Sequence, residues 1–163
     1  MTVVAWDGHT LAADKLAVYG ESRHRVTKIH RVRGHLVGFS GDLDRMQNVL
    51  TWFESGAVAA DFPKVAVEEI CGTLLVITPT GEVLTYERSP RPIRLEQTRV
   101  AIGSGREFAM GAMYQGADAI QAVRVAMALC ISCGEGYDHL TLEQDGETQP
   151  ACNTPAVTPQ VTT

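Results

Sequence analysis

The chain has 163 residues, 45% of them hydrophobic and 20% charged, which is the composition of one ordinary globular domain. A formal net charge of −5 and the lack of a basic stretch argue against a nucleic-acid partner. No apolar run approaches the ~20 residues that span a bilayer, and Asp7 and Asp14 interrupt any signal-peptide pattern. We therefore expect a cytoplasmic protein without a membrane partner.

The cysteines fit the same compartment, because their spacing is unlike that of a secreted disulfide framework. Cys130 and Cys133 form a CxxC, which is the local spacing of a redox pair or of half a zinc site. A second CxxC or a pair of histidines is missing, and His139 is a weak third ligand. We expect two reduced, partly buried thiols, and neither a metal nor another cofactor.

The first segment predicts a β-hairpin. Apolar runs at 3–6 and 10–13 flank Asp7-Gly8, a pair typical of two-residue type I′ turns. The hairpin would return the chain, at Asp14, to the level of its N-terminus.

The next segment predicts a loop, two strands and a helix. Residues 15–20 are expected to be a loop, and 22–29 and 34–40 a pair of strands joined at Arg33-Gly34. Apolar residues at helical spacing predict a helix that opens at Gly41-Asp42 and ends before Gly56. Pro63 would start a short helix that runs to Ile70.

The second half predicts more strands and a block of helices. Pro90 and Pro92 mark a loop. Strands are expected at 73–78, 82–86, 99–102 and 137–142, and helices at 106–115 and 118–131. The composition then shifts to Thr, Pro, Gln and Ala, which predicts one domain over 1–146 and a disordered tail over 147–163.

Strands in hairpins and helices in blocks are typical of an α+β fold with antiparallel sheets. Two such sheets with helical layers outside would accommodate the predicted order.

Thr2 has a chemical property that most second residues lack. It is small enough that methionine aminopeptidase would remove Met1 and expose its α-amine. An N-terminal Thr holds a nucleophilic hydroxyl and a base in one residue, since its amine has an unperturbed pKa of roughly 7.7–8.0. The structural alternative is that Thr2 is merely the second residue of an edge strand.

Four features stand together in this sequence: Thr2, Ala12-Ala13-Asp14, Thr27-Lys28-Ile29, and Ile102-Gly103-Ser104-Gly105 before a helix. In this order they resemble the β-type proteasome subunits and the HslV-type protease, over about residues 2–142. The AWDG-x-TLAAD opening, WFESG and IGSGREFAMGAM look closest to short proteasome-like proteins of some bacteriophages and bacteria. The resemblance implies an N-terminal-nucleophile (Ntn) hydrolase with a four-layer αββα sandwich.

The resemblance also implies a role for each matching residue. Thr2 would be the nucleophile and, through its amine, the base. Lys28 would favour the alkoxide and lower the pKa of the amine, and Asp14 would orient Lys28 and keep it charged. Gly41 matches the glycine whose N–H forms the oxyanion hole, and Ser104 the serine that assists proton transfer at the amine.

The sequence departs from the family pattern near the last strand. The positions that match an Asp and a following Ser or Thr, which support the amine, are Cys130 and Cys133. A thiol hydrogen-bonds weakly and does not supply the charge of a carboxylate. Asp14-Lys15-Leu16 also lacks the arginine of the usual triplet. Phe39 would face the substrate pocket and make it shallow.

Each site residue also has a structural interpretation. Lys28 would be a solvated strand lysine and Asp14 a surface aspartate at a strand end. Ser104 would cap the following helix, and Gly41 would be a turn residue.

We expect a threonine peptidase subunit that forms homo-oligomeric rings and hydrolyses peptides or unfolded proteins, with an AAA+ unfoldase as a further partner. One alternative is a non-catalytic assembly protein that kept the fold while the residues supporting the amine drifted to cysteine. Another is an amidase of the same nucleophile type that acts on a small molecule.

Overall fold

The computed structural model describes residues 2–64 and 72–142, and it places their strands in two larger antiparallel sheets and one separate hairpin. The first sheet has the order β10-β1-β2-β11, from β1 (Val4–Trp6), β2 (Thr10–Asp14), β10 (Val100–Ile102) and β11 (Tyr137–Thr141). The second has the order β5-β6-β7-β8-β9, from β5 (Ile29–Val32), β6 (His35–Ser40), β7 (Thr73–Ile77), β8 (Val83–Tyr86) and β9 (Ile93–Leu95). The hairpin consists of β3 (Leu16–Tyr19) and β4 (Ser22–Arg25).

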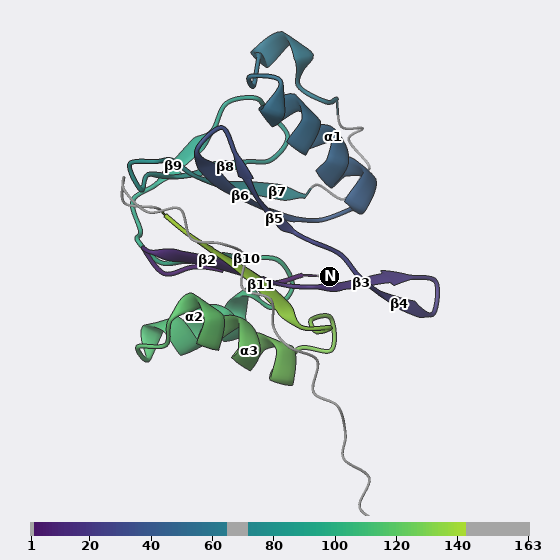
Figure 1. Cartoon of the computed structure of the whole chain (residues 1–163), viewed down its shortest axis with the longest axis vertical. Coiled ribbons are helices and arrows are strands. Elements are labelled where there is room, and N and C mark those ends of the chain that lie inside the picture. The colour runs from purple at the N-terminus through teal and green to yellow at the C-terminus, as the bar shows by residue number, and fades with distance from the viewer. Residues whose placement is uncertain (1, 65–71, 143–163) are drawn as a thin grey trace, which may run out of the picture.

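The helices lie outside the two sheets, which face each other (Figure 1). Helix α1 (Leu43–Glu54) covers the five-stranded sheet, and α2 (Arg106–Tyr114) and α3 (Ala119–Leu129) cover the four-stranded one. A short 3-10 helix, Ala59–Asp61, follows α1. Separate clusters of buried apolar side chains fill the space between the sheets and the space beneath each helical layer.

Strand β1 is buried on both faces, which explains its unbroken apolar sequence. Val4 and Trp6 point into the cluster between the sheets, whereas Val3 and Ala5 contact the cluster under α2 and α3. The antiparallel register pairs Val4 with Ala13 of β2. Val3, the residue before β1, is therefore level with Asp14 at the end of β2, where Asp14 N donates to the Val3 carbonyl at 3.1 Å, and Thr2 immediately precedes this pair.

Many predicted elements are confirmed, including the first hairpin and the three helices α1, α2 and α3. Asp42 caps α1 by accepting from the backbone N–H groups of Asp44 and Arg45, and Gly56 follows the helix with a φ of +110°. Asp118 and Gln121 form a capping box on α3. The mixed α and β content with antiparallel sheets agrees with the predicted class.

The predicted strand pairing of 22–29 with 34–40 is wrong. Residues 22–25 pair instead with 16–19, which were expected to form a loop, while 29–32 pair with 35–38. The basic residues alternate from 23 to 33, which suggests one continuous strand. All residues of β4 are exposed, so no buried side chain marks where β4 ends and β5 begins. Lys28 consequently lies just before β5 rather than inside a strand.

Two further details differ from the prediction. Trp6 pairs with Leu11, so Gly8 and His9 are central in the first turn, and only Gly8 has a positive φ, as in type II′ turns. The loop expected around the prolines also contains strand β9, which forms the edge of its sheet.

Met1 and the tail predicted over 147–163 lie outside the described residues, as do residues 65–70 of the helix predicted from Pro63 to Ile70, whose first two residues are not helical. Within the described part, no helix combines the length and the apolar character that a membrane crossing requires.

Candidate active site

Thr2 lies two residues before the start of β1 and is almost completely buried, with an exposed fraction of 3%. Its main-chain nitrogen donates to Ser104 Oγ at 3.3 Å, and its carbonyl accepts from Gly105 N at 3.1 Å. The loop before α2 therefore holds the backbone of Thr2 through both its N–H and its carbonyl group. Gly103 is required in that loop, because it has a φ of +93° and a Cβ there would lie 2.3 Å from the Thr2 carbonyl oxygen.

The carboxylate of Asp14 is fully buried and accepts four hydrogen bonds. Oδ1 accepts from Lys28 Nζ at 2.8 Å and from Val3 N at 2.9 Å. Oδ2 accepts from Gly134 N at 3.0 Å and from Leu16 N at 3.2 Å. Four donors match the accepting capacity of a carboxylate, so the Asp14 side chain is held in one orientation.

Lys28 is the cationic partner and is itself only 2% exposed. Burial lowers the pKa of Lys28 below its ordinary value, and the Asp14 carboxylate opposes this shift without cancelling it. A buried lysine beside one carboxylate lowers the free energy of unfolding, because both charges lose their water. Such groups are enriched at functional sites.

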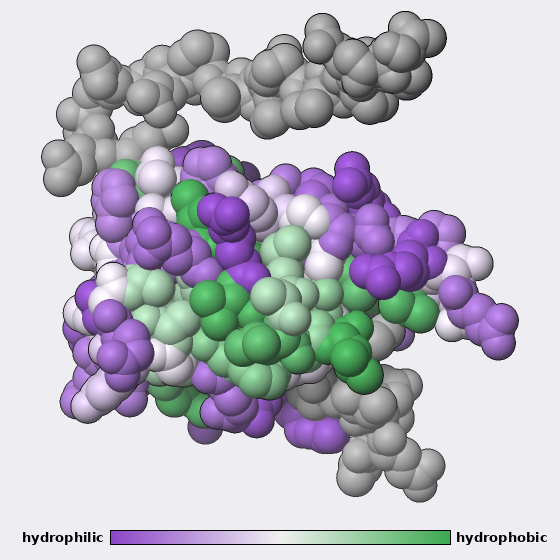
Figure 2. Space-filling view, turned by 90° about the horizontal axis from the view of Figure 1, so that it is seen from below, coloured by the Kyte–Doolittle hydropathy of each residue, from purple (hydrophilic) through white to green (hydrophobic). Residues whose placement is uncertain are grey.

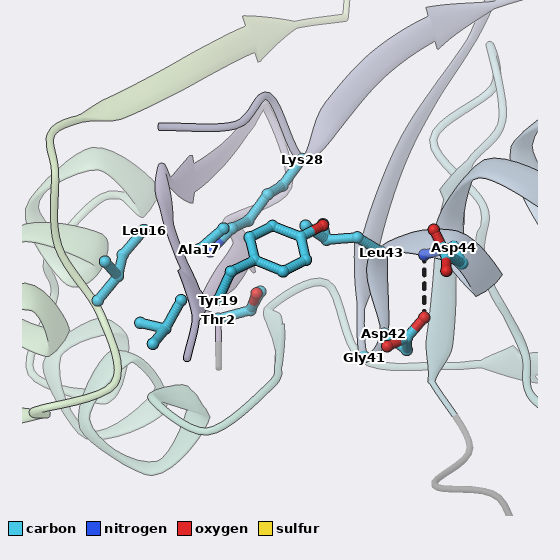
Figure 3. Close-up of a pocket in the computed structure, with 10 residues that line it drawn as sticks. Thr2, Leu16, Ala17, Tyr19, Lys28, Gly41, Asp42, Leu43 and Asp44 are labelled. Atoms are coloured by element: carbon cyan, nitrogen blue, oxygen red, sulfur yellow. Dashed lines mark hydrogen bonds between the residues drawn. The ribbon is translucent and has the colours of Figure 1, made fainter. Parts of the chain in front are cut away.

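A cavity of about 130 Å³ brings several of these residues together. Thr2, Lys28 and the β3 residue Tyr19 lie on one side of it, and the segment 41–44 at the start of α1 lies on the other (Figure 3). Leu16, Ala17 and Val18 complete the lining. The cavity thus joins the start of the chain to the N-terminal end of a helix, where backbone N–H groups carry partial positive charge.

Gly41 opens onto this cavity and has a φ of +138°. A Cβ at this position would lie 2.5 Å from Gly72 Cα, so no larger residue fits. The turn residue predicted from sequence is thus a glycine that the backbone requires, and it lines the same cavity as Thr2.

Phe39 does not line the cavity that contains Thr2. It is 5% exposed and belongs to the cluster under α1, with its ring against Gly72. It also borders a narrow gap that includes Lys28 and His30. Its position is therefore behind Ser40 and Gly41 rather than at the front of the pocket.

Cys130 and Cys133 lie in the turn after α3, and Cys133 is close enough to Asp14 and Lys28 to interact with their charges. Cys130 ends α3, and Cys133 N donates to the Cys130 carbonyl at 3.1 Å. Cys133 is 4% exposed, and burial together with the Asp14 charge raises the pKa of its thiol to about 12. The thiol is therefore neutral near pH 7.

Sequence reasoning missed two contributors to this site, Tyr19 and Gly134. Tyr19 fell in a segment expected to be a loop. Gly134, with a φ of +156°, supplies a backbone N–H to Asp14 from 120 residues away. The Gly134-Glu135-Gly136 run was a signal for a tight turn, but nothing local says which carboxylate the turn contacts.

No group of three or more His, Cys, Asp or Glu side chains is arranged to hold a metal ion within residues 2–64 and 72–142.

No protein-family model and no curated protein matches this sequence. Solved structures share its fold. Free Thiobacillus denitrificans BPH is 20% identical with a TM-score of 0.67, and the alignment covers 90% of this chain and 100% of that one. Its complex with epoxomicin has the same identity and TM-score, and the alignment covers 88% of this chain and 98% of that one. HslV from Trypanosoma brucei is 23% identical with a TM-score of 0.67, covering 88% of this chain and 100% of its own. The chain therefore has the fold of HslV-type structures.

Proposed function

We propose that this chain is a cytoplasmic threonine-type peptidase subunit whose nucleophile is Thr2 after removal of Met1. The observation that carries the proposal is the set of contacts around Thr2. Its nitrogen donates to Ser104 Oγ, and it shares a cavity with Lys28, the buried partner of Asp14. A hydroxyl, an N-terminal amine and a buried cation in one cavity are the parts that this chemistry needs. The layered sheets and helices would then be the Ntn-hydrolase sandwich.

In the proposed reaction the Thr2 hydroxyl attacks a peptide carbonyl and the α-amine of Thr2 accepts its proton. An ester bond forms, the peptide C–N bond breaks, and the amine returns the proton to the leaving nitrogen. Water then hydrolyses the ester by the same route. Ser104 would position the amine, because it already accepts from that nitrogen.

The developing negative charge would be stabilised from two directions. The Gly41 N–H would act as the oxyanion donor at the start of α1, where the helix adds a favourable dipole. Lys28 would favour the Thr2 alkoxide and keep the amine unprotonated, since a nearby positive charge lowers an amine pKa.

We also propose assembly into homo-oligomeric rings, which would place these sites in a closed chamber and admit unfolded chains delivered by an AAA+ unfoldase. The support is an apolar surface on the outer side of α2 and α3, seen in Figure 2 from below. We call it the helical apolar face, and its exposed large side chains are Phe108, Met110, Tyr114, Val125, Leu129 and Ile131. A second copy of the chain is the proposed occupant.

The state of Cys133 favours a second candidate, an assembly protein with a weak or inactive site. A neutral buried thiol gives the amine no anionic support, so the proton transfer would lack a residue that stabilises the charged amine.

The test combines intact-protein mass with hydrolysis of fluorogenic peptides. Mass shows whether Met1 is absent. In the processed protein, we expect Thr2→Ala to abolish hydrolysis and Thr2→Ser to keep part of it, because serine retains the hydroxyl and the amine. Hydrolysis that survives Thr2→Ala would refute the nucleophile assignment. Processed wild type that forms rings but cleaves no peptide would favour the assembly protein.

A further inference from the structure

The turn after α3 holds its two cysteines in position to form a bond. Cys130 and Cys133 are the first and last residues of a turn closed by the hydrogen bond from Cys133 N to the Cys130 carbonyl, at 3.1 Å. Residues so placed in a β-turn have Cα atoms less than ~7 Å apart, which overlaps the separation of ~4.4–6.8 Å found in disulfides. The two thiols also contact each other, and both are free in the structure.

The two thiols differ in their access to solvent. Cys130 is partly exposed at the end of α3, whereas Cys133 is 4% exposed and packs against Gly105, where a Cβ would lie 2.7 Å from its Sγ. An external reagent would therefore meet Cys130 first. The raised pKa of Cys133 means that the reduced pair gains little from ionisation near neutral pH, which favours the disulfide over reduced thiols.

The turn is also joined directly to the buried carboxylate. Gly134, next in the chain after Cys133, donates to Asp14 Oδ2 at 3.0 Å, and its carbonyl accepts from Lys15 N at 3.0 Å. Any restraint on Cys133 therefore restrains one of the four donors that hold Asp14.

We propose that Cys130 and Cys133 form a reversible disulfide, and that this bond clamps the turn that presents Gly134 N–H to Asp14. The proposed oxidant is a small disulfide such as glutathione disulfide. The inference goes beyond the proposed function, because neither the bond nor its consequences for Asp14 require hydrolysis by Thr2.

The bond would form in two exchange steps. The Cys130 thiol gives up its proton and its sulfur attacks one sulfur of the small disulfide, whose S–S bond breaks, and one small thiol leaves with that proton. The Cys133 thiol then attacks Cys130 Sγ, the mixed disulfide breaks, and the second small thiol leaves with the proton from Cys133. One disulfide is reduced and one is formed, so electrons balance.

The first experiment treats the reduced full chain with glutathione disulfide, alkylates the remaining thiols and digests with Glu-C. Cleavage after Glu107 and Glu135 gives a peptide of residues 108–135 that contains Cys130 and Cys133 but neither Cys71 nor Cys152. We expect this peptide unalkylated and internally bonded, and we expect dithiothreitol to restore both thiols. Two alkylated thiols, or a bond to another peptide, would overturn the proposal.

Matched variants test the order of the steps. Cys133→Ser should accumulate glutathione on Cys130, whereas Cys130→Ser should leave the buried Cys133 unreacted. A chain carrying Cys71→Ser and Cys152→Ser is the control and should form the bond like wild type. Equal reaction at both cysteines would overturn the assignment of Cys130 as the attacking thiol.

The second experiment measures the clamp itself by amide hydrogen exchange in the reduced and oxidised proteins. The disulfide closes a short loop, so we expect the Gly134 amide to exchange about tenfold more slowly after oxidation. Gly81 N, which donates to Thr78 O at 2.9 Å in a distant turn, is the control and should not change. An unchanged Gly134 rate in the oxidised protein would refute the clamp.

Discussion

At the residue scale, the buried ion pair of Asp14 and Lys28 is the costly feature of this molecule. Neither side chain is more than 2% exposed, so both charges have lost their water. Each ion is tolerated because the other is present and because backbone N–H groups complete the coordination of Asp14. Hydrophobic residues of similar size would often be as stable at such a position, which supports a chemical reason for the charges.

The first prediction follows from this pairing. Lys28→Met should destabilise the fold by about 3–5 kcal/mol, because it leaves the Asp14 anion buried without its cation. Lys15→Met is the matched control, since Lys15 forms its ion pair with Asp138 at partly exposed positions. That change should cost less than about 1 kcal/mol. Urea unfolding of both variants measures the difference, and similar losses would contradict the role of burial.

A second prediction concerns the pH dependence of stability. The pKa of Cys133 is raised from 9.0 to about 12, so between these values the unfolded thiol is ionised and the folded one is not. The unfolded state then binds fewer protons, and the free energy of unfolding should fall by about 1.4 kcal/mol per pH unit above pH 9. Below pH 9 this contribution is fully retained.

The control for that prediction is Cys133→Ser, which should lack this slope while every other titrating group remains. Urea unfolding of both proteins under reducing conditions at pH 8, 9 and 10 gives the comparison. Parallel pH profiles would show that the thiol is not held neutral by the fold.

At the scale of elements, Asp7 ties the first hairpin to the start of α3. Its carboxylate accepts from the backbone N–H groups of His9 and Thr10 in the turn and from Ala119 in the helix, at 2.8–2.9 Å. Burial raises the pKa of Asp7, but these hydrogen bonds outweigh it and leave the pKa below its ordinary value. A side chain in one turn thus fixes how a helix docks on the sheet.

A third prediction tests this link. Asp7→Ala should lower the free energy of unfolding by about 2 kcal/mol, because three backbone donors lose a charged acceptor. Asp7→Asn should lose less, since its amide oxygen still accepts. Thermal or urea unfolding at pH 7 measures both.

The pH dependence of stability tests whether the hydrogen bonds of Asp7 are made by its charged form. Its lowered pKa contributes stability above the unfolded value of 3.8, and that contribution is lost as the pH falls through the folded pKa. The difference between wild type and Asp7→Ala should therefore shrink in strong acid. A difference that stays constant from pH 7 to pH 2 would contradict the charged hydrogen bonds.

At the scale of the whole molecule, the outer side of α2 and α3 exposes several large apolar side chains (Figure 2). The helical apolar face contains Ile131, Tyr114 and Leu129 at exposed fractions of 97%, 86% and 61%. Large side chains exposed together in this way mark interaction surfaces more often than single exposed ones do. This is the surface through which we propose that copies of the chain contact each other.

The fourth prediction uses this surface. Size-exclusion chromatography with light scattering should show a large homo-oligomer for wild type, and Leu129→Glu should shift it toward smaller species because a charge would be buried at the contact. Ile93→Glu on the edge strand β9 is the control, being 58% exposed and away from that face, and should keep the wild-type size. A monomeric wild type at micromolar concentration would remove the ring proposal.

The sequence alone determined the elements whose signals are local. Apolar spacing and caps determined helices α1, α2 and α3, and alternating or continuous apolar runs determined most strands. The resemblance selected Thr2, Asp14, Lys28, Gly41 and Ser104, and the structure brings Thr2 to Ser104 and Lys28 to Asp14.

Only the tertiary structure decided which strands pair and what surrounds each charge. Residues 22–25 pair with 16–19 rather than with 34–40, because pairing depends on which faces are buried across the sheet and β4 has no buried face to reveal it. The donation from Gly134 to Asp14 crosses 120 residues, and Phe39 packs under α1 instead of lining the cavity. Such contacts form between residues that are far apart in the chain. Local sequence patterns predict individual elements but do not predict how those elements pack against each other.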